Sequence, residues 1–180
     1  MRTPLLILDV SAIGDDKNWH TAIRTIDRSG NVHNLKIHGC KPKFWTAKEN
    51  PPEASKVDGV VSVKDCDLRS IDDKELKEVT LESPFKFREV RDFYYPHYCA
   101  DARWASLVRW IYGWEAVIEV DLSRDLSSLR PVNIHKSEVL ASDFTPRLLY
   151  LDIETADSLD VENAPEMVVS IAIYDSLTGI

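Results

Sequence analysis

The spacing of apolar residues predicts a chain made mostly of β-strands, with few helices. Short runs in which apolar residues are contiguous or alternate, separated by Gly, Pro, Asn and Asp, are typical of strands and turns. Residues 101–111 differ, because their apolar side chains recur three and four positions apart, the spacing of one face of a helix. Residues 84–94, with Pro84 near the first turn, predict a second and shorter helix. The expected strands are residues 5–10, 22–26, 32–37, 40–46, 57–63, 76–81, 117–120, 130–134, 148–155 and 167–174.

Together these segments indicate an α+β fold in which a mixed β-sheet carries a few helices. Residues 27–31, Asp-Arg-Ser-Gly-Asn, predict the tip of a β-hairpin, because a turn sequence stands between two strand patterns. The apolar face of residues 101–111 is expected to bury Trp104 and Ile111 against the sheet. The pattern changes near residues 143–146, which predicts one domain over residues 1–143 and a second beginning at residue 144.

The formal net charge of −8 argues against a chain that binds nucleic acid through a surface that is basic throughout. Hydrophobic residues make up 44% of the chain and charged residues 29%, the balance of a soluble globular protein. No run approaches the roughly 18 apolar residues of a membrane-spanning helix, so we expect a cytoplasmic protein without membrane contact. Cys40, Cys66 and Cys99 form no Cys-x-x-Cys pair, which predicts reduced thiols rather than a zinc site or a disulfide framework.

The clearest candidates for a chemical function are Asp152 and Glu154. They lie in the expected strand 148–155, after the apolar run Leu-Leu-Tyr-Leu. Alternate residues of a strand share a face, so the two carboxylates are expected about 6–7 Å apart on one side. Mg²⁺ and Mn²⁺ prefer such oxygen ligands. Two such ions can activate water and stabilise the leaving oxygen during phosphodiester hydrolysis. Acids buried in a central strand are costly unless something binds them, which favours a metal site.

The spacing by itself does not decide the matter, because two other acid pairs share it. Asp65-Cys66-Asp67 and Glu119-Val120-Asp121 have the same arrangement, and we interpret both as solvated carboxylates on strand edges. An incidental Asp-x-Glu in a non-catalytic nucleic-acid-binding or scaffold module therefore stays open as an alternative. A stand-alone exonuclease with its own extra domain is a third.

Several segments, in order, resemble the B-family DNA polymerases. Residues 151–155, Leu-Asp-Ile-Glu-Thr, look like the first exonuclease motif of that family, a hydrophobic strand ending in Asp-Ile-Glu-Thr. Residues 165–172 resemble the next strand of the same ribonuclease-H-like fold, and residues 7–10 resemble the opening strand of archaeal members. The remaining similar segments are residues 39–45, 79–84, 113–114 and 130–132.

The resemblance implies the N-terminal domain of an archaeal-type B-family polymerase, followed by the first strands of its 3′→5′ exonuclease domain. The whole protein would extend primer-template DNA from deoxynucleoside triphosphates, excise mismatched 3′ ends, and work in the nucleoid, with a sliding clamp as a further partner. Asp152 and Glu154 would ligate Mg²⁺ or Mn²⁺ in the complete exonuclease site. The later exonuclease and polymerase motifs are absent from residues 1–180, so we expect this segment alone to be inactive.

A second group of residues could contact nucleic acid. Lys41, Pro42, Lys43 and Phe44 belong to a basic segment that also includes Trp45 and has Lys36 and Lys48 nearby. Its aromatic residues could stack on bases while the lysines follow the backbone. A solvated basic edge is the alternative. Archaeal polymerases read template uracil at positions that match Ala12, Pro42 and Lys43, although aromatic residues are common at two of these; a simple strand bend at Pro42 also explains the proline. Apart from His33 and His38, the histidines show no metal-ligand spacing, and we interpret these two as hairpin surface residues.

Overall fold

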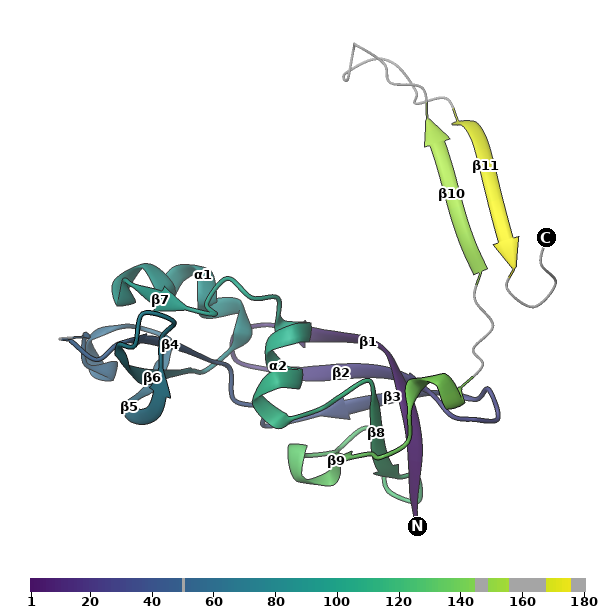
Figure 1. Cartoon of the computed structure of the whole chain (residues 1–180), viewed down its shortest axis with the longest axis horizontal. Helices are drawn as coiled ribbons and strands as arrows, with labels where there is room; N and C mark the ends of the chain where they lie inside the picture. The colour runs from purple at the N-terminus through teal and green to yellow at the C-terminus, as the bar shows by residue number, and fades with distance from the viewer. Residues whose placement is uncertain (50, 145–148, 156–167, 176–180) are drawn as a thin grey trace. The chain divides into compact units, whose positions relative to one another are not determined.

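A computed structural model describes residues 1–49, 51–144, 149–155 and 168–175, with side chains for the residues up to 144. Contacts divide the chain into two units, Met1–Phe144 and Thr145–Ile180, which are described separately. Both units are shown in Figure 1.

The first unit begins with a five-stranded sheet in the order β3-β2-β1-β8-β9, in which every neighbouring pair of strands is antiparallel. Its strands are β1 (Arg2–Gly14), β2 (Trp19–Ile26), β3 (Val32–Ile37), β8 (Val117–Asp121) and β9 (His135–Lys136). Alternate side chains of these strands form the first core. Its buried members are Leu5, Val10, Ile23, Leu35, Ile37, Cys40, Val108, Trp114, Ile118, Val120, Leu129 and Ile134.

A four-stranded antiparallel sheet in the order β5-β6-β4-β7 builds the second half of the unit. Its strands are β4 (Lys43–Ala47), β5 (Val60–Arg69), β6 (Glu75–Leu81) and β7 (His97–Tyr98). It encloses a second core, whose buried members are Phe44, Trp45, Val57, Leu76, Val79, Leu81, Phe87, Val90, Tyr94, Ala100 and Leu107.

Helix α2 (Trp104–Tyr112) contributes to both cores and packs against β1 (Figure 1). Val108 is buried in the first core and Leu107 in the second, while Trp104 packs against both. The helix ends at Gly113, whose φ of +66° is a left-handed conformation that glycine adopts without steric cost. The predicted apolar stripe of residues 101–111 is thus confirmed, and it holds the two halves of the unit together.

The segment before α2 is built of short helical turns rather than one helix. The α-helix α1 (Phe87–Val90) lies between the 3₁₀ turns η2 (Pro84–Lys86) and η3 (Arg91–Tyr94). Ser83 begins this segment because its hydroxyl accepts a hydrogen bond from the Phe85 N–H. The other 3₁₀ turns of the described chain are η1 (Ala54–Lys56), η4 (Pro131–Asn133) and η5 (Ala141–Asp143).

The α+β prediction, with mostly antiparallel sheets and few helices, is confirmed, but residues 130–134 do not form the expected strand. The Asn133 side chain accepts a hydrogen bond from the Arg130 N–H at 2.8 Å, and the Asn133 N–H donates to the Arg130 carbonyl at 2.9 Å. These local bonds offer the backbone an alternative to strand pairing and form η4.

Two interpretations of individual side chains also change. Glu119 and Asp121 lie on β8, which pairs with β1 and β9 and is an inner strand, whereas Asp65 and Asp67 are exposed on the edge strand β5 as expected. The tyrosines beside Pro96 are predicted from the sequence to be packing residues; Tyr94 is buried, but Tyr95 is 87% exposed, so the prediction is wrong for Tyr95.

The predicted hairpin tip at residues 27–31 is present between β2 and β3, and Asp27 organises it. Its carboxylate accepts hydrogen bonds from the Ser29 and Asn31 N–H groups and from the Asn31 side chain, at 2.8–3.0 Å. It also lies 3.1 Å from His33 Nε2. The Asn31 side chain, followed by His33, lowers the pKa of Asp27 to about 2.

This depressed pKa predicts acid sensitivity of the hairpin. Because the folded-state pKa lies below the ordinary value of 3.8, the stabilisation is present above about pH 4 and is lost as the pH falls toward 2. In thermal unfolding scans across this range, we expect the midpoint of Asp27→Asn to fall less steeply with pH than that of the natural chain. Asp72→Asn is the control, since Asp72 is exposed and forms no hydrogen bond or ion pair within the described residues. Equal slopes for all three proteins would contradict the assignment.

Candidate functional site

The second unit contains the two strands on which the carboxylate motif was predicted. Strand β10 (Leu149–Thr155) pairs antiparallel with β11 (Val168–Asp175), as Figure 1 shows. Asp152 stands opposite Ala172 and Glu154 opposite Ser170, and the register shifts immediately after Glu154. The side chains of Asp152 and Glu154 lie outside the described part of the structure, so their shared face and their metal binding stay predictions.

The basic segment 41–44 is tied into the first unit by its own backbone and side chains. The Pro42 carbonyl accepts a hydrogen bond from the Leu81 N–H at 2.8 Å, and the proline itself is buried. The Lys43 ammonium donates to Glu78 at 2.8 Å. Lys41 is exposed, while its N–H donates to the Tyr112 hydroxyl at 2.7 Å. Pro42 and Lys43 therefore have structural partners, and the uracil-reading role implied for them and for Ala12 stays a prediction.

The aromatic residues of this segment do not offer a stacking surface, which corrects the expectation for Phe44. Phe44 is fully buried and Trp45 is 5% exposed. The reason is that both faces of β4 are covered: Phe87 and Tyr94 pack on Phe44, and the indole of Trp110 packs against Trp45 at 4.8 Å between ring centroids. A strand covered on both sides leaves no ring face for a base.

Two of the four lysines near these rings are also neutralised by ion pairs. Besides Lys43, the Lys48 ammonium pairs with Glu75 at 2.7 Å, and this hydrogen bond raises the pKa of Lys48. Lys36 and Lys41 are exposed and form no ion pair with an acid in the part of the chain that the structure describes. These two lysines are what remains of the predicted basic edge.

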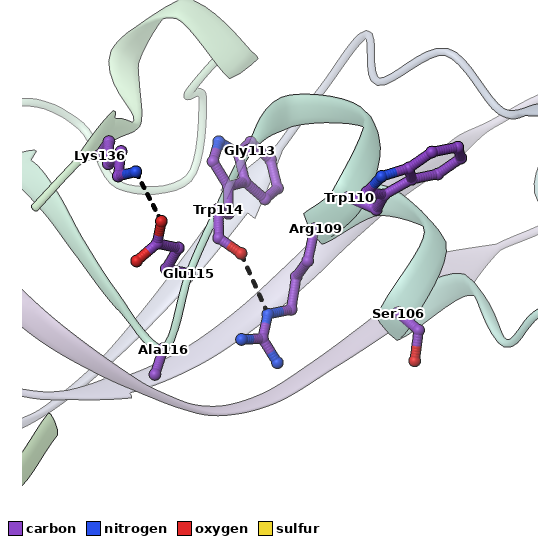
Figure 2. A pocket seen from close by; sticks show the side chains of 8 residues that line it. All are labelled: Ser106, Arg109, Trp110, Gly113, Trp114, Glu115, Ala116 and Lys136. Atoms are coloured by element: carbon purple, nitrogen blue, oxygen red, sulfur yellow. Dashed lines mark hydrogen bonds and ion pairs between the residues drawn. The ribbon is translucent and has the colours of Figure 1, made fainter. Parts of the chain in front are cut away.

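A hollow of about 560 Å³ beside the C-terminal end of α2 was not foreseen from the sequence (Figure 2). Its lining residues are Ser106, Arg109, Trp110, Gly113, Trp114, Glu115, Ala116 and Lys136. The only available signal was that Arg109 and Trp110 lie off the apolar stripe of the helix, and Trp110 is indeed 57% exposed.

The electrostatics of this hollow favour no single class of ligand. The Arg109 Nε donates to the Trp114 carbonyl at 3.3 Å, and this bond orients a guanidinium that could meet a phosphate. Lys136, however, pairs with Glu115 at 2.6 Å, and the end of a helix carries a partial negative charge. The positive and negative contributions to the electrostatic potential in the hollow therefore offset one another.

The three cysteines do not suggest a reactive site. All are free thiols, and burial raises the pKa of Cys40 to about 11, which keeps it protonated and unreactive at neutral pH. In the described residues, no group of three or more His, Cys, Asp or Glu side chains is placed to hold a metal ion. None of the helices described is both long enough and apolar enough to cross a membrane.

Comparison with known proteins gives a structural relationship without a sequence relationship. No model of a known protein family matches the chain, and no curated protein sequence matches it. Among solved structures, it is similar to the family B DNA polymerase from the hyperthermophilic archaeon Pyrobaculum calidifontis, with a TM-score of 0.69 and 19% sequence identity. The similarity covers 98% of this chain and 26% of the polymerase chain.

The chain shares the fold of part of that polymerase. It spans about a quarter of the polymerase's length, and at 19% identity the relationship concerns the fold. The resemblance read from short sequence segments is therefore confirmed at the level of architecture.

Proposed function

We propose that this chain is the N-terminal domain of a family B DNA polymerase, residues 1–143, joined to the first strands of its 3′→5′ exonuclease domain, residues 144–180. The observation that carries the proposal is the structural similarity to an archaeal family B polymerase over 98% of the chain. The Leu-Asp-Ile-Glu-Thr sequence of β10 supports it independently, because it resembles the family's exonuclease motif.

In this proposal Asp152 and Glu154 are the metal ligands that the chain contributes to the exonuclease site. Their donor set fits Mg²⁺ or Mn²⁺, since both ions prefer carboxylate oxygens and retain waters or phosphate oxygens at the other positions. When bound, such ions polarise the phosphodiester and lower the pKa of the attacking water. The chain's own part is to hold two carboxylates two residues apart on a strand that β11 supports by antiparallel pairing.

Nucleic-acid contacts of the first unit are proposed for Lys36 and Lys41. Both are exposed cations, and they could meet phosphate groups of template DNA through charge alone. The overall charge of −8 makes such contacts local rather than general.

Titration of the whole chain with Mn²⁺ tests the metal assignment. We expect roughly millimolar affinity, because only part of a ligand set is present. In Asp152→Ala, the paramagnetic broadening of signals from β10 and β11 should disappear. Asp65→Ala is the matched control, because Asp65 and Asp67 have an acid-x-acid spacing on the exposed edge strand β5.

The outcome separates the proposed function from the alternative of a non-catalytic binding or scaffold module. Broadening that persists in Asp152→Ala, or that is lost equally in Asp65→Ala, would favour an incidental Asp-x-Glu. In a polypeptide that also carries the later exonuclease and polymerase motifs, Asp152→Ala should abolish 3′→5′ excision and leave primer extension intact.

A further inference from the structure

Two histidines far apart in the sequence stand side by side on the first sheet. His20 lies on β2, and His38 follows the last residue of β3. Thr21 pairs with Ile37, so His20 and His38 occupy the next pair of opposing positions. Their ring centroids are 5.5 Å apart, and the ring planes are inclined by 39°. Both side chains are partly exposed, so an ion could reach them from solvent.

We propose that His20 and His38 form a two-histidine site for a divalent transition-metal ion of the Zn²⁺ class. Imidazole nitrogen is a ligand that suits Zn²⁺, Ni²⁺ and Cu²⁺. With a Zn–N distance of about 2.0–2.1 Å, each ring centroid would lie about 3.2 Å from the ion, and tetrahedral geometry would place the centroids about 5.2 Å apart. The observed separation of the ring centroids, 5.5 Å, is close to this value.

One ring nitrogen of His38 is already held by a backbone carbonyl. Its Nε2 lies 3.2 Å from the Ser127 carbonyl oxygen. Because a carbonyl only accepts hydrogen bonds, Nε2 carries the proton and Nδ1 keeps its lone pair for an ion. Metal-binding histidines are commonly held in this way, with the second ring nitrogen donating to a carbonyl.

The carbonyl of Ser127 is itself held in place by backbone hydrogen bonds on either side of it. The Lys36 N–H donates to the Leu126 carbonyl at 2.8 Å, and the His38 N–H donates to the Leu129 carbonyl at 2.8 Å. The Leu129 N–H donates a hydrogen bond to the Lys36 carbonyl at 3.1 Å. Residues 126–129 therefore run beside β3 as a fixed partner, and the orientation of the His38 ring does not depend on a loose loop.

The residues around the two histidines set the expected affinity and selectivity of metal binding. The residue opposite His20 on β1 is Ile13, which supplies no charge. Lys36, two residues before His38 on the same face of β3, places an ammonium group near the pair and opposes cation binding. With two imidazoles as ligands, the remaining coordination positions fall to water, so the site would bind an ion reversibly. The two-histidine site would not bind Mg²⁺, because Mg²⁺ prefers oxygen ligands.

Calorimetric titration of the whole chain with Zn²⁺ tests the proposal. The experiment uses a Cys99→Ser background, because the exposed Cys99 thiol could bind Zn²⁺, and excess Mg²⁺ to occupy carboxylates. We expect one ion per chain, with affinity at least tenfold weaker in both His20→Ala and His38→Ala. His135→Ala is the matched control, a partly exposed histidine on β9 that should leave the affinity unchanged.

A variant that is expected to bind Zn²⁺ more tightly separates loss of the site from loss of folding. Lys36→Ala removes the opposing charge, and we expect it to strengthen Zn²⁺ binding roughly two- to fivefold at low ionic strength. A misfolded variant would not bind more tightly. Unchanged affinity in His20→Ala and His38→Ala, an equal loss in His135→Ala, or no gain in Lys36→Ala would each count against the site.

Discussion

Replacing Phe44 with alanine is expected to lower the free energy of unfolding by about 3–5 kcal/mol, the range measured for large-to-small changes at buried aromatic residues. Phe44 is fully buried in the second core. Its ring lies 6.1 Å from that of Phe87 and 5.8 Å from that of Tyr94, centroid to centroid. Truncation removes these contacts and leaves a cavity that a strand paired on both sides cannot close by moving.

Urea denaturation followed by circular dichroism measures this loss. Phe44→Leu keeps much of the side-chain volume and should cost less than half as much. Phe93→Ala is the matched control, because Phe93 is 62% exposed and its truncation should change stability by no more than about 0.5 kcal/mol. A loss for Phe44→Ala as small as that of Phe93→Ala would show that the ring is not buried, and would revive its predicted role in base stacking.

Trp104→Ala is the second change with a large expected effect, about 3–5 kcal/mol. Trp104 packs against both cores and meets Trp19 edge to face, with ring centroids 5.5 Å apart. Its indole N–H donates to the hydroxyl of the buried Thr21 at 3.2 Å. Removing the side chain therefore weakens both cores at once and takes away a hydrogen-bond donor from a buried group.

Two further variants separate packing from hydrogen bonding at this position. Trp104→Phe keeps an aromatic ring but loses the donor, so we expect a smaller cost of about 1–2 kcal/mol. Trp110→Ala, on the exposed side of the same helix, should cost less than Trp104→Ala, because Trp110 is 57% exposed. If Trp110→Ala proved the more damaging of the two, α2 would not join the cores through Trp104. Circular dichroism is the suitable probe, since each variant removes one of five tryptophans.

The carboxylate pair and the histidine pair are proposed to bind different classes of metal ion. Asp152 and Glu154 are proposed to hold Mg²⁺ or Mn²⁺ within a nuclease site, whereas His20 and His38 are proposed to hold an ion of the Zn²⁺ class on the first sheet. Because the two sites differ in ligand type and lie in different units, either proposal can fail without affecting the other.

Local patterns were sufficient to predict most of the strands of this protein and its longer helix, but not the short strands β7 and β9. The strand periods, the apolar stripe of α2, the turn at residues 27–31 and the two strands β10 and β11 all follow from interactions between residues close in sequence. The Leu-Asp-Ile-Glu-Thr segment is likewise a local pattern, and the resemblance that it suggested agrees with the fold of an archaeal family B polymerase.

Tertiary structure decided which side chains are available to a ligand. Phe44 and Trp45 were predicted to stack on bases because they stand among lysines, but residues from η3 and α2, about 50 to 65 positions later, cover both faces of β4. His20 and His38 meet only because β2 and β3 pair in one particular register. Burial and cross-strand contact depend on which distant segments pack together, and that information is spread over the whole chain rather than held in any one motif.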